Sequence, residues 1–239
     1  MDFIENQFTA LKKKYPYLYL LNEDQRFLIR GTIFIESDGV KDSYEIEISL
    51  SPKYPSQIPY VKETGSKIPT DFHHYQDGYL CLEIPFRIWE IFRQEETLLN
   101  YVDGLLVPYL FSYTYFKNTG KLPFGERRHG TNGILDDYKD RFKTSYDLIA
   151  VDLLRILAED TYRGHHICPC GSSKKLRNCH GEILLHMKSV GYNFMKDYLM
   201  ILCELKNNKT ITDVSKYIST KVKKTLENIK SNPNEKWGY

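Results

Sequence analysis

The chain has 239 residues, of which 41% are hydrophobic and 27% are charged, and its mean hydropathy is −0.47. This composition is typical of a soluble globular protein with enough apolar material for one or two domains. No apolar run approaches the roughly 20 residues that a membrane span needs. The first residues, Met1 to Lys14, lack the basic and then apolar order of a secretion signal. The sequence therefore predicts a cytoplasmic protein with no membrane partner.

Charge is divided unequally along the chain. Residues 1–162 hold 19 Lys and Arg against 25 Asp and Glu, whereas residues 163–239 hold 14 against 6. A basic tail of this kind can contact nucleic acid, but a solvated helix face, or one docked on the acidic part of the chain, explains it better. No aromatic residues alternate with the basic ones as they do in a stacking surface. Nucleic acid is therefore not the expected partner.

Hydrophobic spacing predicts the elements of the first half. Ile4, Phe8 and Leu11 share one helical face, which predicts a helix over 3–14. Alternation over 26–36 and 43–50 around a turn predicts a hairpin, and a short strand is expected at 60–63. Residues 64–95 show no sustained period, and irregular segments of this length are usually functional.

Four further helices are expected at 95–110, 135–160, 182–206 and 212–230, each with an apolar face. A polar loop separates the first two. Its glycine-rich part, residues 125–133, is either an ordinary connection or a source of donors, His129 or Asn132, for a nearby site. Cys203 is expected in the core beside Leu202. Helices and antiparallel strands in this order predict an α+β fold.

Five cysteines are present, and three of them lie within twelve residues. An odd, clustered set favours metal or thiol chemistry over a disulfide framework. The cluster reads Cys168-Pro169-Cys170-Gly171-Ser172-Ser173-Lys174-Lys175-Leu176-Arg177-Asn178-Cys179-His180. Three thiolates and one imidazole suit a closed tetrahedral zinc site, so Cys168, Cys170, Cys179 and His180 are the predicted ligands of a structural Zn²⁺. His165 and His166 lie outside the motif and are expected on the surface.

The zinc segment, about residues 163–182, resembles the SEC-C motif, including its Cys-Pro-Cys-Gly-Ser start and its Lys-Lys followed by Cys-His. In that family the small zinc element mediates protein contacts. The resemblance therefore implies an adaptor role for this segment.

A second resemblance covers about residues 1–110. It is carried by Tyr54-Pro55-Ser56-Gln57-Ile58-Pro59-Tyr60-Val61, by Asp77-Gly78-Tyr79-Leu80-Cys81-Leu82-Glu83-Ile84, and by Trp89, eight residues after the cysteine. These landmarks are similar to those of ubiquitin-conjugating enzymes. The replacement of the family's Asn, described below, resembles bacterial relatives of these enzymes. The resemblance implies a UBC-like antiparallel sheet with flanking helices. It also implies a transferase that carries a ubiquitin-like or C-terminal-glycine protein as a thioester on Cys81.

One departure from that family lies eight residues before the cysteine. The family keeps Asn there, in a His-Pro-Asn tripeptide, whereas this chain has His73 followed by His74. An imidazole at position 73 could donate to the oxyanion or accept the amine proton, since it titrates near neutral pH. His73 could equally hold the loop as a structural residue.

The resemblance implies four domain segments: a UBC-like domain at 1–145, a connecting helix at 146–162, the zinc motif at 163–182 and a helical basic tail at 183–239. Implied partners are an activating enzyme, the carried protein and an acceptor lysine. Similar proteins are encoded in bacterial antiphage operons that use cyclic-oligonucleotide signalling. By this analogy, a nucleotidyltransferase is a further implied partner. The alternatives are a catalytically inactive UBC-like adaptor that binds a ubiquitin-like tail, and a nucleic-acid-binding zinc protein.

Overall fold

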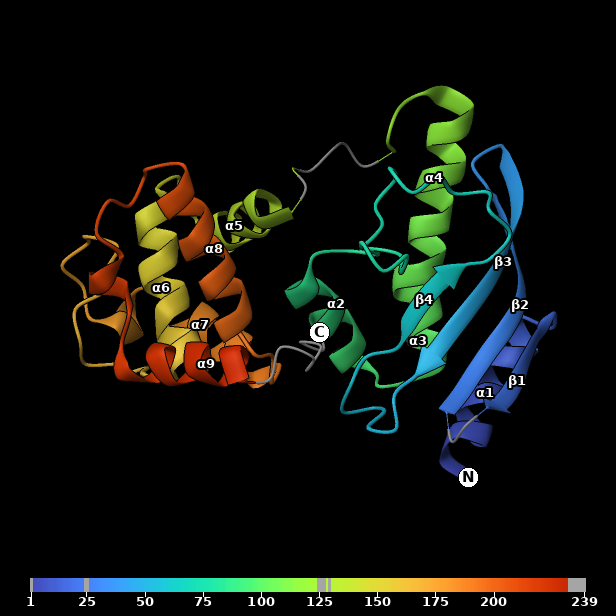
Figure 1. The fold of residues 1–239 in the computed structure, drawn as a ribbon, viewed down its shortest axis with the longest axis horizontal. Helices are drawn as coiled ribbons and strands as arrows, with labels where there is room; N and C mark the ends of the chain where they lie inside the picture. Colours follow the sequence, from blue (N-terminus) through green and yellow to red (C-terminus); the bar gives the residue numbers. More distant parts are fainter. Residues whose placement is uncertain (1, 24–25, 124–127, 129, 232–239) are drawn as a thin grey trace. The chain divides into compact units, whose positions relative to one another are not determined.

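The computed structural model describes residues 2–23, 26–123, 128 and 130–231. The described residues form two compact units, one over residues 2–123 and one over residues 128–231. The first holds an antiparallel sheet with flanking helices, and the second holds helices and the cysteine cluster (Figure 1). The predicted α+β class is confirmed.

The sheet of the first unit has the order β1-β2-β3-β4, with each strand antiparallel to the next. The strands are β1 (Leu18–Glu23), β2 (Arg26–Ser37), β3 (Val40–Leu50) and β4 (Tyr60–Glu63). The predicted hairpin and short strand are confirmed as β2, β3 and β4. The sequence does not predict β1, because its residues do not alternate between apolar and polar. Strand β1 can pair with β2 because residue 31 is a glycine. A Cβ at this position would lie only 2.1 Å from the carbonyl oxygen of Tyr17.

Two predictions for the helices of this unit need correction. The first predicted helix is confirmed as α1 (Asp2–Lys14), but the segment expected to be irregular to residue 95 ends in helix α2 (Pro85–Gln94). Pro85 suits the first position of this helix, because a backbone N–H there would have no acceptor within the helix. Trp89 is buried in this helix, 8% exposed.

The next helix is longer than predicted. Helix α3 (Leu98–Tyr101), a π-helical turn (Val102–Leu106) and α4 (Val107–Thr119) follow one another without a break, whereas the sequence predicts an end at 110. Pro108 lacks the N–H of a regular α-helical bond, and a π-helical turn just before it accommodates this loss. The sequence predicts a polar loop after residue 110. In the structure, Tyr113 and Thr114 lie in α4 and are buried.

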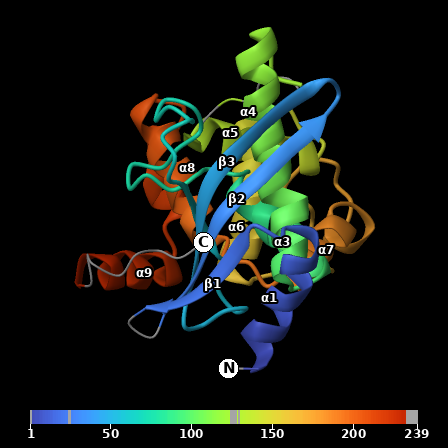
Figure 2. The ribbon, with the colours of Figure 1, turned by 90° about the vertical axis from the view of Figure 1, so that its right-hand side faces the viewer.

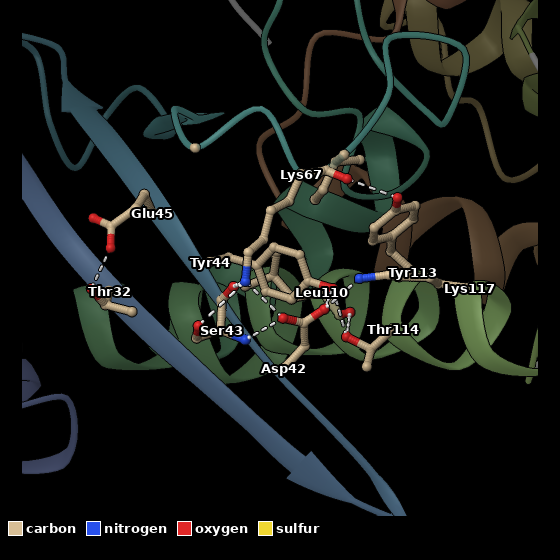
Figure 3. Close-up of polar contacts among 12 residues, drawn as sticks. Thr32, Asp42, Ser43, Tyr44, Glu45, Lys67, Leu110, Tyr113, Thr114 and Lys117 are labelled. Carbon is tan, nitrogen blue, oxygen red and sulfur yellow. Dashed lines mark hydrogen bonds and ion pairs between the residues drawn. The ribbon is translucent and has the colours of Figure 1, made fainter.

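Helix α4 packs on β2 and β3 (Figure 2). The Tyr44 hydroxyl lies 2.8 Å from the Thr114 hydroxyl in a buried contact between sheet and helix. Figure 3 shows the polar contacts beside it, where Asp42 accepts from Lys67 and Lys117. Burial raises the pKa of Asp42, but the hydrogen bonds from Lys67, Ser43 and Lys117 outweigh it and hold this pKa below its usual range. An ionised Asp42 thus ties the segment after β4 to the sheet.

The second unit is helical. Its elements are α5 (Gly130–Arg141), α6 (Asp147–Glu159), a 3₁₀ turn (Leu176–Asn178), α7 (Gly181–Ser189), α8 (Met195–Asn207), a 3₁₀ turn (Val214–Tyr217) and α9 (Thr220–Ser231). The predicted single helices at 135–160 and 182–206 are each two helices, and the one expected at 212–230 begins only at Thr220. Among the described residues, no helix is both long and apolar enough to cross a bilayer.

Two placements differ from the sequence predictions in this unit. Helix α5 packs with α6 and α8 in the second compact unit, whereas the predicted first domain extends to 145. Cys203 is exposed, and its expected place in the core is wrong. Helix α8 buries Tyr198, Ile201, Leu202 and Leu205. One residue beyond Leu202 turns about 100° round the helix, which carries Cys203 off this face.

Candidate functional site

Cys81 lies in a short antiparallel turn. The N–H of Cys81 donates to the carbonyl of His73 at 2.7 Å, and the N–H of Tyr75 donates to the carbonyl of Tyr79 at 2.8 Å. Between them, His74 and Leu80 form an isolated bridge. Gly78 closes the turn with a φ of +80°, a conformation that favours glycine. We call residues 73–81 the cysteine hairpin.

The register of this hairpin decides which side chains meet. Residues directly opposite share a face, and residues two apart return to it, so Tyr75, Tyr79 and Cys81 belong to one face. Leu80 belongs to the other face, where it is buried, 4% exposed. Its N–H donates to the carbonyl of Val61 in β4 at 2.8 Å. The strand that carries Cys81 is therefore held from both sides, by His73 and by β4.

Helix α4 fixes the other arm of the hairpin. The Tyr109 hydroxyl donates to the carbonyls of Phe72 and His73 at 3.0 and 3.3 Å. One turn further along, Tyr113 donates to the carbonyl of Lys67 at 2.8 Å (Figure 3). The irregular segment before Cys81 is thus anchored through its backbone to a regular helix. Such an anchor holds a cysteine in a loop at a fixed position.

Cys81 is partly exposed, and its surroundings favour the protonated thiol. Burial raises the pKa of Cys81, a hydrogen bond from the side chain of Tyr75 lowers it, and the negative charge of Glu83 raises it again. Their net effect is a pKa above the ordinary value of a thiol. A partner or a donor at the sulphur is needed to favour the thiolate near neutral pH.

The two histidines before Cys81 are placed differently. His73 has a φ of +44°, and its ring packs edge-on against Phe72 with the ring centroids 4.7 Å apart. Its backbone is beside Cys81, as the hairpin register requires. The His74 ring nitrogen Nδ1 lies 2.7 Å from the carbonyl oxygen of Phe72, which gives His74 a structural contact. A left-handed backbone at position 73 is one that Asn adopts more readily than most residues.

The four predicted zinc ligands come together in the second unit. The ligand atoms of Cys168, Cys170, Cys179 and His180 all lie within 4.8 Å of one another. The Nδ1 atom of His180 is 3.2 Å from the sulphur of Cys168 and 3.3 Å from that of Cys179, and the sulphurs of Cys170 and Cys179 are 3.5 Å apart. In a tetrahedral zinc site, neighbouring sulphurs are about 3.7 Å apart and sulphur and nitrogen about 3.5 Å apart. The spacing of the four atoms therefore fits zinc.

The second ring nitrogen of His180 fits the same interpretation. Its Nε2 lies 2.9 Å from the carbonyl oxygen of Phe142, just after α5. A metal-bound histidine commonly donates its other N–H to such a carbonyl, which fixes the ring for coordination. Since all four ligands come from the protein, a zinc ion here would be structural and would join the motif to α5.

Other described residues that the sequence singles out take no part in either site. His165 and His166 are exposed, as predicted. In the glycine-rich loop, residues 125–127 and His129 lie outside the described residues, and Gly130, Asn132 and Gly133 belong to the start of α5. The sequence does not single out Tyr75. The Asp77-Gly78 pair is a hairpin signal that could have placed it diagonally opposite Cys81.

Comparisons with known proteins find one family-model match and two more distant similarities. Residues 167–182 match the SEC-C motif family, so the second unit contains this motif. The chain is also similar to a probable ubiquitin-conjugating enzyme E2 W-A from Danio rerio, with 28% identity over 95 residues. That match covers 36% of this chain and 61% of the relative, so the chain spans about three fifths of the relative's length.

Among solved structures, the chain is similar to the yeast vps23 UEV domain, crystallised in complex with a vps27 PSDP peptide. The sequence identity is 16% and the TM-score is 0.34, and the likeness covers 44% of this chain and 77% of that one.

Proposed function

We propose that the first unit is a UBC-like acyl transferase that carries a ubiquitin-like or C-terminal-glycine protein as a thioester on Cys81. The observation that carries this proposal is the placement of Cys81. The residue is partly exposed, its strand is hydrogen-bonded to both His73 and β4, and the hairpin is anchored by Tyr109. The similarity to a ubiquitin-conjugating enzyme and the Cys81 and Trp89 landmarks support the same reaction.

The proposed reaction has two transfers. The Cys81 thiolate attacks the carbonyl carbon of a thioester on the activating enzyme, and the activating enzyme's thiolate leaves. An acceptor amine then attacks the new thioester, the C–N bond forms, the C–S bond breaks with its electron pair on sulphur, and the amine proton passes to solvent. Neither step needs a metal or a nucleotide at Cys81. Adenylation of the carried protein belongs to the separate activating enzyme.

A charging assay tests this proposal. The zinc-loaded chain is incubated with ATP, ubiquitin and a ubiquitin-activating enzyme, and in parallel with ubiquitin-like proteins of its own organism and their activating enzyme. We expect an adduct that disappears on treatment with excess thiol. If no carrier gives such an adduct, while the activating enzyme is itself charged, the transferase proposal is wrong.

For His73 we propose a role in discharge of the thioester. Replacing it by alanine is expected to slow discharge of preformed thioester onto free lysine by about 10²-fold, the effect of removing one donor to an oxyanion. Loading is expected to change less. His73→Asn, which restores the family's residue and suits a positive φ, is expected to discharge near the parent rate. Single-turnover discharge rates measure both, and unchanged discharge in His73→Ala would leave only a structural role.

The second candidate is a catalytically inactive UBC-like adaptor. The raised pKa of Cys81 and the missing His-Pro-Asn tripeptide favour it. An adaptor would bind a ubiquitin-like tail without covalent transfer, so it would show affinity for the carrier in the absence of ATP and no thiol-sensitive adduct. The charging assay separates the two candidates.

The SEC-C motif is the proposed recruiting element of either version. With zinc held by Cys168, Cys170, Cys179 and His180, it would present a rigid surface to a partner protein. The wider proposal includes an acceptor lysine, a cytoplasmic setting and an antiphage defence operon with a nucleotidyltransferase. The neighbouring genes test that setting. We expect genes for an activating enzyme and a nucleotidyltransferase beside the gene for this chain.

A further inference from the structure

Strand β2 is longer than the strand that pairs with it on one side. The pairing with β1 ends where Leu18 lies opposite Gly31, whereas β3 pairs with β2 as far as Ser37. Residues 32–37 therefore have a neighbouring strand on one side only, and no other strand in the described part of the chain covers their second side. Figure 2 shows the hairpin of β2 and β3 extending past β1. We call residues 32–37 the free edge.

A groove follows the free edge. It has a volume of about 600 Å³, and it is lined by side chains from both faces of β2, with Phe34 on one face and Ile35 on the other. Apolar residues of α4 and of the segment that precedes β1 also line it: Pro16, Tyr17, Val107, Pro108 and Phe111. Because successive side chains of a strand point to opposite faces, a groove that both kinds reach lies at the edge of the sheet.

We propose that this groove binds an extended segment of a partner protein, which adds to the sheet as a strand along the free edge. An edge strand carries backbone N–H and C=O groups without a strand partner, and these form a template for strand addition. Six residues of β2 span about 20 Å, the length of an ordinary strand. The proposal does not depend on the reaction proposed for Cys81, since no residue of the cysteine hairpin lines the groove.

The two walls of the groove determine which side chains the added strand should carry. On one wall, the ring of Tyr17 lies 5.1 Å from that of Phe34, and the two residues are 64% and 54% exposed. On the other wall are Val107 and Phe111 of α4, the helix that packs on β2 and β3. Neighbouring residues of the added strand would face these two walls in turn. We therefore expect neighbouring apolar residues in the partner segment.

The charges of the groove favour a basic residue at one end of that segment. Lys14 and Asp103 balance each other in an ion pair of 2.7 Å. The other charged residues of the lining are Glu36 and Asp38, both acidic, where β2 ends. Lys41 lies 3.1 Å from Glu36, but these two side chains are 71% and 72% exposed, and such pairs contribute little. A Lys or Arg of the partner would complement the acidic end.

Peptide selection tests this chemistry. The full zinc-loaded chain is presented to a library of random dodecapeptides displayed on phage, and the dissociation constants of the selected peptides are measured by fluorescence anisotropy. We expect selected peptides to combine neighbouring apolar residues with Lys or Arg. Phe34→Ala is expected to weaken their binding about tenfold or more, because an exposed aromatic contact is lost. Tyr19→Ala removes an aromatic residue of β1 that is 47% exposed and lies outside the lining, and it should match the parent.

A second pair of variants tests the charges. Glu36→Gln combined with Asp38→Asn is expected to weaken binding about tenfold at low salt and by much less at high salt, because screening removes the attraction. Asn suits residue 38, whose φ is +50°. Glu5→Gln combined with Asp71→Asn removes two exposed acidic residues outside the lining and should retain the parent affinity. Equal effects of both double variants would contradict a specific acidic end.

Amide hydrogen exchange locates the bound peptide. Strand addition should slow exchange in residues 32–37, because the N–H groups that face the free edge gain acceptors. Protection of another segment instead, or a selection that yields no peptide sensitive to Phe34→Ala, would overturn the proposal. A dimer that dissociates in Phe34→Ala, as measured by sedimentation, would assign the free edge to a second copy of the chain and would also overturn it. Charging of Cys81 in Phe34→Ala should match the parent, so this result is separate from the transferase test.

Discussion

Replacing Cys81 by alanine is expected to abolish the thiol-sensitive adduct completely, because no other residue of the cysteine hairpin can form a thioester. Cys81→Ser is expected to form a slower adduct that survives thiol treatment, since a serine hydroxyl gives an oxygen ester and not a thioester. Both variants remove or exchange one atom at a partly exposed position. Electrophoresis with and without excess thiol, checked by intact mass, measures the outcome.

Cys203 provides the matched control for this result. It is also a free thiol and is more exposed than Cys81, but it lies in helix α8 of the second unit. Cys203→Ser should charge like the parent. A thiol-sensitive adduct that persists in Cys81→Ala and disappears in Cys203→Ser would place the reaction at Cys203 and contradict the proposed role of Cys81.

Removing two zinc ligands is expected to eliminate bound metal. The parent should hold about one zinc per chain by its ligand count, and the double variant Cys168→Ser, Cys179→Ser should hold none, because two ligands cannot retain a tetrahedral site. Structural zinc binding in small motifs is worth about 10–16 kcal/mol, which exceeds what a segment this short gains by apolar burial. Residues 163–182 should therefore lose their fold. Elemental analysis and amide hydrogen exchange of this segment measure both effects.

Charging of Cys81 should survive the loss of zinc, since the cysteine hairpin and the zinc ligands belong to different compact units. Cys203→Ser again serves as the control, because it removes a thiol from the second unit without removing a ligand. Complete loss of charging in a metal-free chain whose first unit remains folded would contradict this division of roles. It would make the zinc motif part of the transferase machinery.

Local sequence patterns predict much of this fold because they report local structure. The alternation in residues 26–36 and 43–50 predicts the hairpin of β2 and β3, and the spacing of Ile4, Phe8 and Leu11 predicts α1. The zinc ligands are equally local, since four ligands within thirteen residues need no distant partner. These are the cases in which neighbouring residues alone determine the outcome.

Other features depend on contacts between distant residues, and sequence patterns miss them. Strand β1 exists because Gly31 admits a close approach of Tyr17, and the polar-looking end of α4 is buried because Thr114 meets Tyr44 of β3. The anchoring of the cysteine hairpin by Tyr109 also spans 36 residues or more of sequence. No local period reveals such pairs, so the sequence identifies Cys81 and His73 but not the groups that hold or contact them.

The most direct test of the central claim is to trap the carried protein at position 81. In Cys81→Lys, an amine replaces the thiol, so the carrier's C-terminal carbonyl should form a stable amide that neither excess thiol nor hydroxylamine cleaves. Tandem mass spectrometry of the digested adduct is predicted to find the carrier's C-terminal remnant on the peptide that contains position 81. A remnant on any other residue, or no amide with any carrier that the activating enzyme accepts, would contradict transfer through Cys81.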